Sequence, residues 1–293
     1  MKPFHYFRPD SLPQAVDLLA EHGSAARLLA GGTDVIVRMR LGHLAPEVVI
    51  DVKRIQALED GVSIANGSLR IGARCVMTDL AAHPRIREYF PALVESSNVV
   101  GSVQIRNRAT LAGNVCNASP AADTVPALLV YGARVNAIGP AGERTVPLED
   151  FLKGPGQTAL ASSEIVTSID LPVPVEPTGS KFGRVTRRWG VDLATVNLCG
   201  LVTASGKVRF AYGAVGPKAF VVGDETGRLA SGEVSPEEVT NLIQHFISHA
   251  APRTDVRGGR DYRLAMLKTM SARVLNASHE RLRADTERRA RLQ

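Results

Sequence analysis

A pair of adjacent glycines near the N-terminus constrains the fold of this chain more than any other feature. The segment Ala30-Gly31-Gly32-Thr33-Asp34 follows a buried strand expected at residues 27–30 and precedes a short helix expected at 35–41. Glycines let backbone amides approach a ligand without interference from Cβ, and a helix N-terminus adds partial positive charge. The segment therefore suits a phosphate or pyrophosphate, to which Thr33 could also donate a hydrogen bond. A tight turn that needs positive φ explains the same residues, because the spacing matches neither common nucleotide-binding glycine motif.

The surrounding sequence predicts alternating strands and helices. Strands at 4–7 and 48–52 complete a β-α-β-α-β unit over residues 1–55, and Asn66-Gly67 is typical of a hairpin turn. Three prolines at 172–179 indicate a linker, so we place a domain boundary near residues 175–180. Strands at 193–203 and 207–215 and helices at 236–249 and 261–274 follow it.

A second polar segment also contains short hydrogen-bonding groups around a glycine. Residues 106–114 include Thr110, Gly113 and Asn114, and Ser119-Pro120-Ala121-Ala122-Asp123 follows. Asp123 precedes an apolar helix expected at 124–129. Its carboxylate could cap that helix, or it could accept a hydrogen bond from a ligand imide or hydroxyl.

The charge distribution argues against a nucleic-acid-binding protein. The 293 residues suit about two domains, and the net charge of +6 lies entirely in residues 253–293, which carry 11 basic and 5 acidic side chains. A mixed-charge C-terminus without interleaved aromatic residues suits a solvated helix or a docking tail.

Cysteine usage and hydropathy point to a cytoplasmic protein. Cys75, Cys116 and Cys199 lie far apart, so this chain specifies neither an iron–sulfur cluster nor a structural zinc site. No metal site is expected, because His245 and His249 have no third ligand in view. We expect neither a signal peptide nor a membrane span, since no apolar run is long enough.

The polar segments, taken together, resemble the FAD-binding subunit of the molybdenum hydroxylases, the family of xanthine dehydrogenase and aerobic carbon monoxide dehydrogenase. Residues 30–34, 104–114 and 119–123 match in order and spacing, and 212–217 and 261–263 resemble the family's C-terminal domain. The resemblance implies an α+β fold. It consists of a vanillyl-alcohol-oxidase-type FAD-binding domain at 1–175, with two α/β subdomains at about 1–55 and 56–175. A C-terminal domain at 176–293, with a three-stranded antiparallel sheet and a helix bundle, would follow.

The resemblance also implies which residues contact FAD. The pyrophosphate would be held by backbone amides of two segments: Ala30, Gly31, Gly32, Thr33 and Asp34, and Thr110, Leu111, Ala112, Gly113 and Asn114. Asp123 would meet the polar edge of the isoalloxazine ring, and Val166 would make an apolar contact. Lys181 matches a lysine near the flavin, with Arg184 as a competing choice. Ala112 departs from the family's usual glycine, which negative φ would tolerate.

The implied activity is electron transfer within an oxidoreductase. FAD, bound non-covalently, would accept electrons from an iron–sulfur small subunit and pass them to NAD, a quinone or another acceptor. The molybdenum cofactor and 2Fe-2S clusters are expected only in partner subunits, which would form a dimer of heterotrimers with this chain. The alternative is a stand-alone FAD-dependent oxidase or reductase of the same fold. Trp189, the only tryptophan, could cover the flavin, serve an interface or pack in the core.

Overall fold

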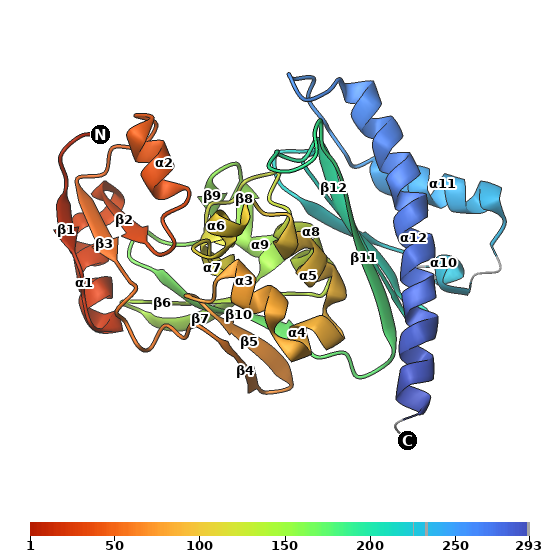
Figure 1. Ribbon diagram of the computed structural model, residues 1–293, viewed down its shortest axis with the longest axis horizontal. Coiled ribbons are helices and arrows are strands. Elements are labelled where there is room, and N and C mark those ends of the chain that lie inside the picture. Colours follow the sequence, from red (N-terminus) through yellow and green to blue (C-terminus); the bar gives the residue numbers. More distant parts are fainter. Residues whose placement is uncertain (225, 232–233, 292–293) are drawn as a thin grey trace.

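The computed structural model describes residues 1–224, 226–231 and 234–291, which form three parts along the longest axis (Figure 1). The N-terminal part is a small α/β unit, the middle part is a sheet covered by short helices, and the C-terminal part is a sheet backed by the long helix α12. The predicted mixture of α and β elements is confirmed at this level.

The N-terminal part has a three-stranded parallel sheet in the order β1-β3-β2. Ser11 begins the first helix by accepting a hydrogen bond from the Gln14 amide at 3.4 Å, and Gly23 ends it with φ of +50°. The elements of this part are β1 (His5–Phe7), α1 (Leu12–His22), η1 (Gly23–Ala25), β2 (Ala26–Leu29), α2 (Val35–Arg40) and β3 (Val48–Asp51).

The middle part has a five-stranded antiparallel sheet in the order β4-β5-β10-β6-β7. Asn66 and Gly67, with φ of 48° and 73°, form the predicted hairpin turn. The strands are β4 (Val62–Ala65), β5 (Ser68–Gly72), β6 (Arg134–Gly139), β7 (Gly142–Pro147) and β10 (Ile165–Pro172), and a separate pair is formed by β8 (Leu152–Gly154) and β9 (Gln157–Thr158). The helices are α3 (Met77–Ala82), α4 (Pro84–Tyr89), α5 (Pro91–Asn98), α6 (Val103–Arg106), α7 (Leu111–Cys116), α8 (Thr124–Val130) and α9 (Leu148–Phe151).

The C-terminal part corrects the predicted three-stranded sheet, because four antiparallel strands pair in the order β11-β12-β13-β14. The additional strand has only four residues, Phe220–Gly223, and follows Gly216-Pro217 closely. The strands are β11 (Thr178–Val185), β12 (Val196–Thr203), β13 (Val208–Gly213) and β14 (Phe220–Gly223), and the helices are α10 (Arg228–Ser231), α11 (Pro236–Ile247) and α12 (Arg260–Ala290). The last helix continues 16 residues beyond the predicted end at Val274, because Leu275, Ser278 and Leu282 still pack against the sheet.

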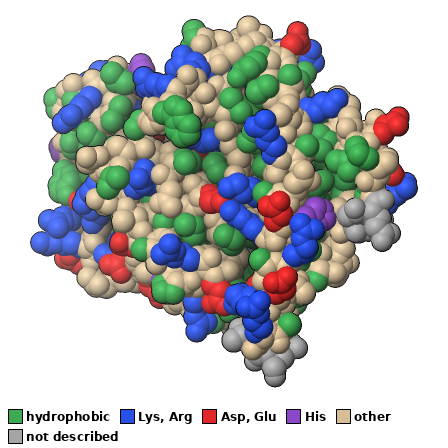
Figure 2. All heavy atoms as spheres, turned by 45° about the vertical axis from the view of Figure 1, so that its right-hand side comes forward, with side chains coloured by type: hydrophobic (Ala, Val, Ile, Leu, Met, Phe, Trp, Pro, Cys, Tyr) green, Lys and Arg blue, Asp and Glu red, His purple; other side chains and the backbone are tan. Residues whose placement is uncertain are grey.

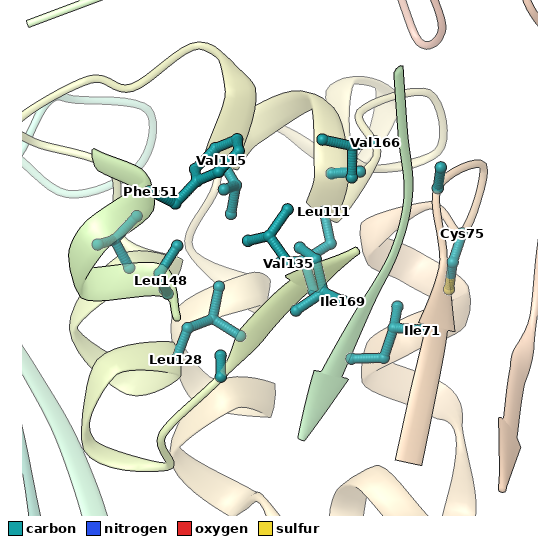
Figure 3. Packing of buried hydrophobic residues seen from close by; sticks show 14 of the residues in the cluster. Ile71, Cys75, Leu111, Val115, Leu128, Val135, Leu148, Phe151, Val166 and Ile169 are labelled. Atoms are coloured by element: carbon teal, nitrogen blue, oxygen red, sulfur yellow. The ribbon is translucent and has the colours of Figure 1, made fainter. Parts of the chain in front are cut away.

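The C-terminal sheet buries both of its faces. Along β12, Leu198 packs with α11 and α12, whereas Cys199 and Leu201 join the core of the middle part. That core lies between β10, β6 and helices α7 to α9, where Leu111, Val166 and Ile169 point toward one another (Figure 3). The fold therefore presses one face of the C-terminal sheet onto the middle part, which carries the second polar segment and Asp123.

Candidate functional site

The structure brings the two glycine-containing segments into direct backbone contact. A Cβ atom built on Gly31 would lie 2.0 Å from the carbonyl oxygen of Arg108 and 3.1 Å from the Cα of Ala109. No side chain fits at such distances, so glycine is required here for close approach. Gly31 and Arg108, which are 77 residues apart in the sequence, thus lie against each other.

The first segment forms a sharp turn into α2. Gly32 has φ of +78°, which favours glycine, so the tight-turn explanation of this pair is correct for one of its members. The first turn of α2 leaves backbone N–H groups without acceptors inside the helix. Asp34 does not cap that helix with its side chain; its Oδ1 accepts a hydrogen bond from Asn117 Nδ2 at 3.2 Å. The turn and the ligand-binding explanations are therefore compatible.

The second segment is a capped helix start. Thr110 Oγ1 accepts a hydrogen bond from the Gly113 amide at 3.0 Å, and a Cβ on Gly113 would lie 2.8 Å from that oxygen. Ala112 lies within α7 and is not among the residues with positive φ, so the departure from glycine costs no backbone strain. Asn114 Oδ1 accepts a hydrogen bond from the Thr124 hydroxyl at 2.7 Å, which fixes α7 to α8.

Leu111 and Val166, both predicted contact residues, have side chains in the hydrophobic core. Leu111 is fully buried and Val166 is 5% exposed, and both belong to the hydrophobic core (Figure 3). Leu111 can therefore offer only its backbone to a ligand. Cys116, at the end of α7, is partly buried, and desolvation raises the pKa of its thiol to about 12.

Asp123 is a buried carboxylate near these segments. It occupies the N-cap position of α8 but makes no capping hydrogen bond, so the predicted capping role is wrong. Its Oδ2 accepts from Arg184 Nη1 at 2.8 Å and its Oδ1 accepts from Asn197 Nδ2 at 3.0 Å. Burial raises the pKa of Asp123, and the hydrogen bond from Asn197 and the charge of Arg184 oppose that rise.

Strand alternation decides between the two basic residues of β11. Glycines 179 and 183 face α12, and Lys181, two residues from each, forms an ion pair of 2.7 Å with Glu95. Arg184 lies on the opposite face, toward Asp123. The structure therefore brings Arg184 to the Asp123 carboxylate and leaves Lys181 at the edge of the sheet.

Asn197 is the site residue that sequence reasoning missed. It lies directly opposite Arg184 in the β11–β12 pairing, so both side chains leave the same face of the sheet. The one available signal was an isolated asparagine in an otherwise apolar strand, Val196–Thr203. The partner residue is 74 positions away, which no local pattern reveals.

Other predictions from the sequence concern Trp189, possible metal ligands and possible membrane spans. Trp189 is fully exposed, so the core-packing option is wrong. Within the described ranges, no group of three His, Cys, Asp or Glu side chains is arranged to hold a metal ion. None of the described helices is both long enough and apolar enough to span a membrane.

Comparisons with known proteins identify the family. Residues 2–174 match the FAD binding domain in molybdopterin dehydrogenase, and residues 181–278 match the CO dehydrogenase flavoprotein C-terminal domain. The chain belongs to the molybdopterin dehydrogenase FAD-binding family. It is 33% identical to the carbon monoxide dehydrogenase medium chain of Hydrogenophaga pseudoflava, over 95% of this chain and 98% of that one. It is 30% identical to a putative xanthine dehydrogenase FAD-binding subunit of Escherichia coli strain K12, over 92% and 94%.

Solved structures agree with this assignment. Carbon monoxide dehydrogenase from Hydrogenophaga pseudoflava superposes with a TM-score of 0.88 at 31% identity, covering 96% of this chain and 99% of that one. Quinoline 2-oxidoreductase from Pseudomonas putida 86 gives 0.84 at 26% identity, covering 96% and 99%. The predicted family, the FAD cofactor and the role as an oxidoreductase flavoprotein subunit are confirmed.

Proposed function

We propose that this member of the molybdopterin dehydrogenase FAD-binding family transfers electrons within a heteromeric complex. A large subunit would hold the molybdenum cofactor and oxidise the substrate, and a small iron–sulfur subunit would deliver the electrons. This chain would pass them to NAD, a quinone or another acceptor. The contact between the two glycine-containing segments carries the proposal, because it builds one phosphate-binding surface from both. The proposal also includes a cytoplasmic dimer of heterotrimers. Within it, this chain would have domains at 1–175 and 176–293.

The residues present fit FAD. Gly31 is backbone-packed and Gly32 is left-handed, so residues 30–34 expose main chain where side chains would obstruct a pyrophosphate. Residues 110–114 add the first turn of α7, capped by Thr110. The N-termini of α2 and α7 both belong to this surface, and each favours negative charge. We assign the pyrophosphate to these two segments.

We assign the polar edge of the flavin ring to Asp123 and Arg184. An ionised Asp123 accepts hydrogen bonds only, as recognition of an imide N–H requires. Arg184 is half-buried beside it and supplies a fixed positive charge. Val166 would contribute an apolar contact, and Lys181 would act at longer range through its position on β11.

When bound, FAD would serve as a carrier that takes up two electrons and passes them to the electron acceptor. The chain's own residues bind that carrier, orient it and place charge beside it. A permanent cation such as Arg184 stabilises negative charge that develops nearby, most strongly where water is excluded.

Purification of the native complex tests the proposal. We expect one FAD per copy of this chain, released on denaturation, together with co-purifying molybdenum and iron–sulfur subunits. The complex should reduce its acceptor when supplied with substrate, whereas this chain alone should turn over no substrate. A complex that retains full acceptor reduction without flavin would overturn the proposal.

A further inference from the structure

Both oxygens of the Asp123 carboxylate are held by the C-terminal sheet. Arg184 belongs to β11 and Asn197 to β12, whereas Asp123 lies in the loop before α8. The FAD-binding domain therefore supplies the carboxylate, and the other domain supplies the groups that orient it.

Asn197 also holds the backbone of the same loop. Its Nδ2 atom lies 3.5 Å from the carbonyl oxygen of Ala121 and 3.3 Å from that of Ala122, besides its contact with Asp123. The side chain is completely buried. Three acceptors converge on one amide group, so the orientation of the Asn197 amide is fixed by its surroundings.

The opposite side of Asn197 confirms this orientation. Its Oδ1 atom has no hydrogen-bond partner among the described residues and packs against Gly213, where a Cβ would lie 2.2 Å away. Rotating the amide would place an oxygen against three oxygens. The fold thus keeps a buried, unpaired acceptor to retain the donor on the loop side, a cost of the kind that functional sites carry.

A main-chain hydrogen bond also attaches the loop that carries Asp123 to the C-terminal part. The Ala214 amide donates to the Pro120 carbonyl at 2.7 Å, and Ala214 has φ of +61°, which is unusual for a residue with a Cβ. Arg263 of α12 is buried and donates to the carbonyl oxygen of Ala214 at 3.2 Å. The loop carrying Asp123 is therefore held by the Asn197 side chain of β12 and by the main chain of Ala214, directly after β13.

We propose that Asn197 is a positioning residue for electron transfer. It fixes the Asp123 carboxylate and its loop, so that the flavin ring meets a hydrogen-bond acceptor held in one position. The inference rests on the proposed function, because it takes Asp123 as the ring contact. It gives the C-terminal domain a direct part in building the flavin site.

Substitution of Asn197 in the intact complex tests this role. Asn197→Leu keeps the approximate shape and removes the donor, so we expect FAD to bind about 10- to 100-fold more weakly to the deflavinated complex. The midpoint potential and visible spectrum of the bound FAD should also change. Ser180→Ala is the matched control, since Ser180 joins β11 to Tyr131 across the same domain boundary at 2.5 Å without touching Asp123.

A double-mutant cycle separates positioning from general destabilisation. In an Asp123→Ala background, Asn197→Leu should have little further effect on FAD affinity, because the residue acts through Asp123. An equal loss in both backgrounds would overturn the inference, and so would wild-type affinity and potential in the leucine variant. If that variant does not fold, Asn197→Ser in the same cycle decides. Failure of the wild-type complex to hold FAD would instead refute the proposed function itself, and this inference with it.

Discussion

Glu95 is predicted to be a principal tie between the long C-terminal helix and the FAD-binding domain. Its Oε1 accepts from Lys181 Nζ at 2.7 Å and from Arg281 Nη2 at 2.5 Å, and its Oε2 accepts from the Phe182 amide at 3.0 Å. The last bond satisfies a backbone donor on the outer edge of β11. One carboxylate thus links α5, β11 and α12.

The cost of Glu95→Ala can be worked from these contacts. The Glu95 side chain is 26% exposed and both cations are 35% exposed, so each ion pair is worth about 0.5–1 kcal/mol after solvent screening. The backbone hydrogen bond adds about 1 kcal/mol. We therefore expect a loss of about 2–3 kcal/mol in the free energy of unfolding, which lowers Tm by roughly 4–10 °C for a chain of this size.

Chemical and thermal unfolding of the purified chain measure this loss, with Glu88→Ala as the control. Glu88 forms an ion pair of 2.7 Å with Arg288, which lies on α12 like Arg281. The Glu88 side chain is 39% exposed, however, and that of Arg288 is 40% exposed. We expect at most about 0.5 kcal/mol there. Equal effects of the two substitutions would refute the reasoning, because exposure would then not distinguish the two ties.

The stabilisation by Glu95 should also depend on pH in a definite direction. Burial alone would raise the pKa of Glu95, but Arg281, Lys181 and the Phe182 amide outweigh it and hold the pKa below its ordinary value. A carboxyl with a depressed folded pKa adds stability above its unfolded pKa of about 4.3 and loses it as the pH falls through the folded value. The difference between wild type and Glu95→Ala should therefore be constant near neutral pH and shrink in acid. A difference that grows in acid would contradict this account.

Three further predictions concern the flavin site and its surroundings. Gly31→Ala should abolish FAD binding and lower Tm, because its Cβ would lie 2.0 Å from the Arg108 carbonyl; flavin content and a melting curve check both, and a fully loaded variant would contradict the close approach. Cys116 should resist thiol reagents at neutral pH until the chain unfolds, since burial raises its pKa to about 12; labelling followed by peptide mass mapping checks this, and rapid native labelling would contradict it. Trp189 should emit as a solvated indole open to ionic quenchers, and it should lose that access on assembly if its loop meets a partner; a shielded spectrum in the isolated chain would contradict the exposed geometry.

Features encoded within a few residues were predictable from the sequence. Ser11 and Ser235 cap the helices expected of them, and Asn66-Gly67 makes its turn. The first glycine-containing segment was also recognisable, since a strand, two glycines and a helix start follow one another closely there. Local backbone preferences decide such features without help from distant residues.

Features that depend on strand register were not predictable. Lys181 and Arg184 are three residues apart, so they face opposite sides of β11, but only the pairing with β12 shows which side meets the site. The same pairing brings Asn197 to Asp123. The length of α12 escaped prediction because its last turns carry mixed charge, a pattern also typical of a solvated tail.

The structure gives the basic C-terminus a role inside the chain. Arg281 contacts Glu95, Arg288 contacts Glu88 and Asp285, and Arg289 contacts Asp285, so these arginines join α12 to the FAD-binding domain or support that contact. Figure 2 shows basic and acidic side chains intermingled over the forward face rather than a uniform basic surface. Charge reversal at Arg288 and Arg289 would break these contacts, so a loss of complex assembly could not be separated from a loss of folding stability. Arg283, exposed on the same helix, is the better position, because Arg283→Glu leaves these ion pairs intact and reports only on a partner that meets this face.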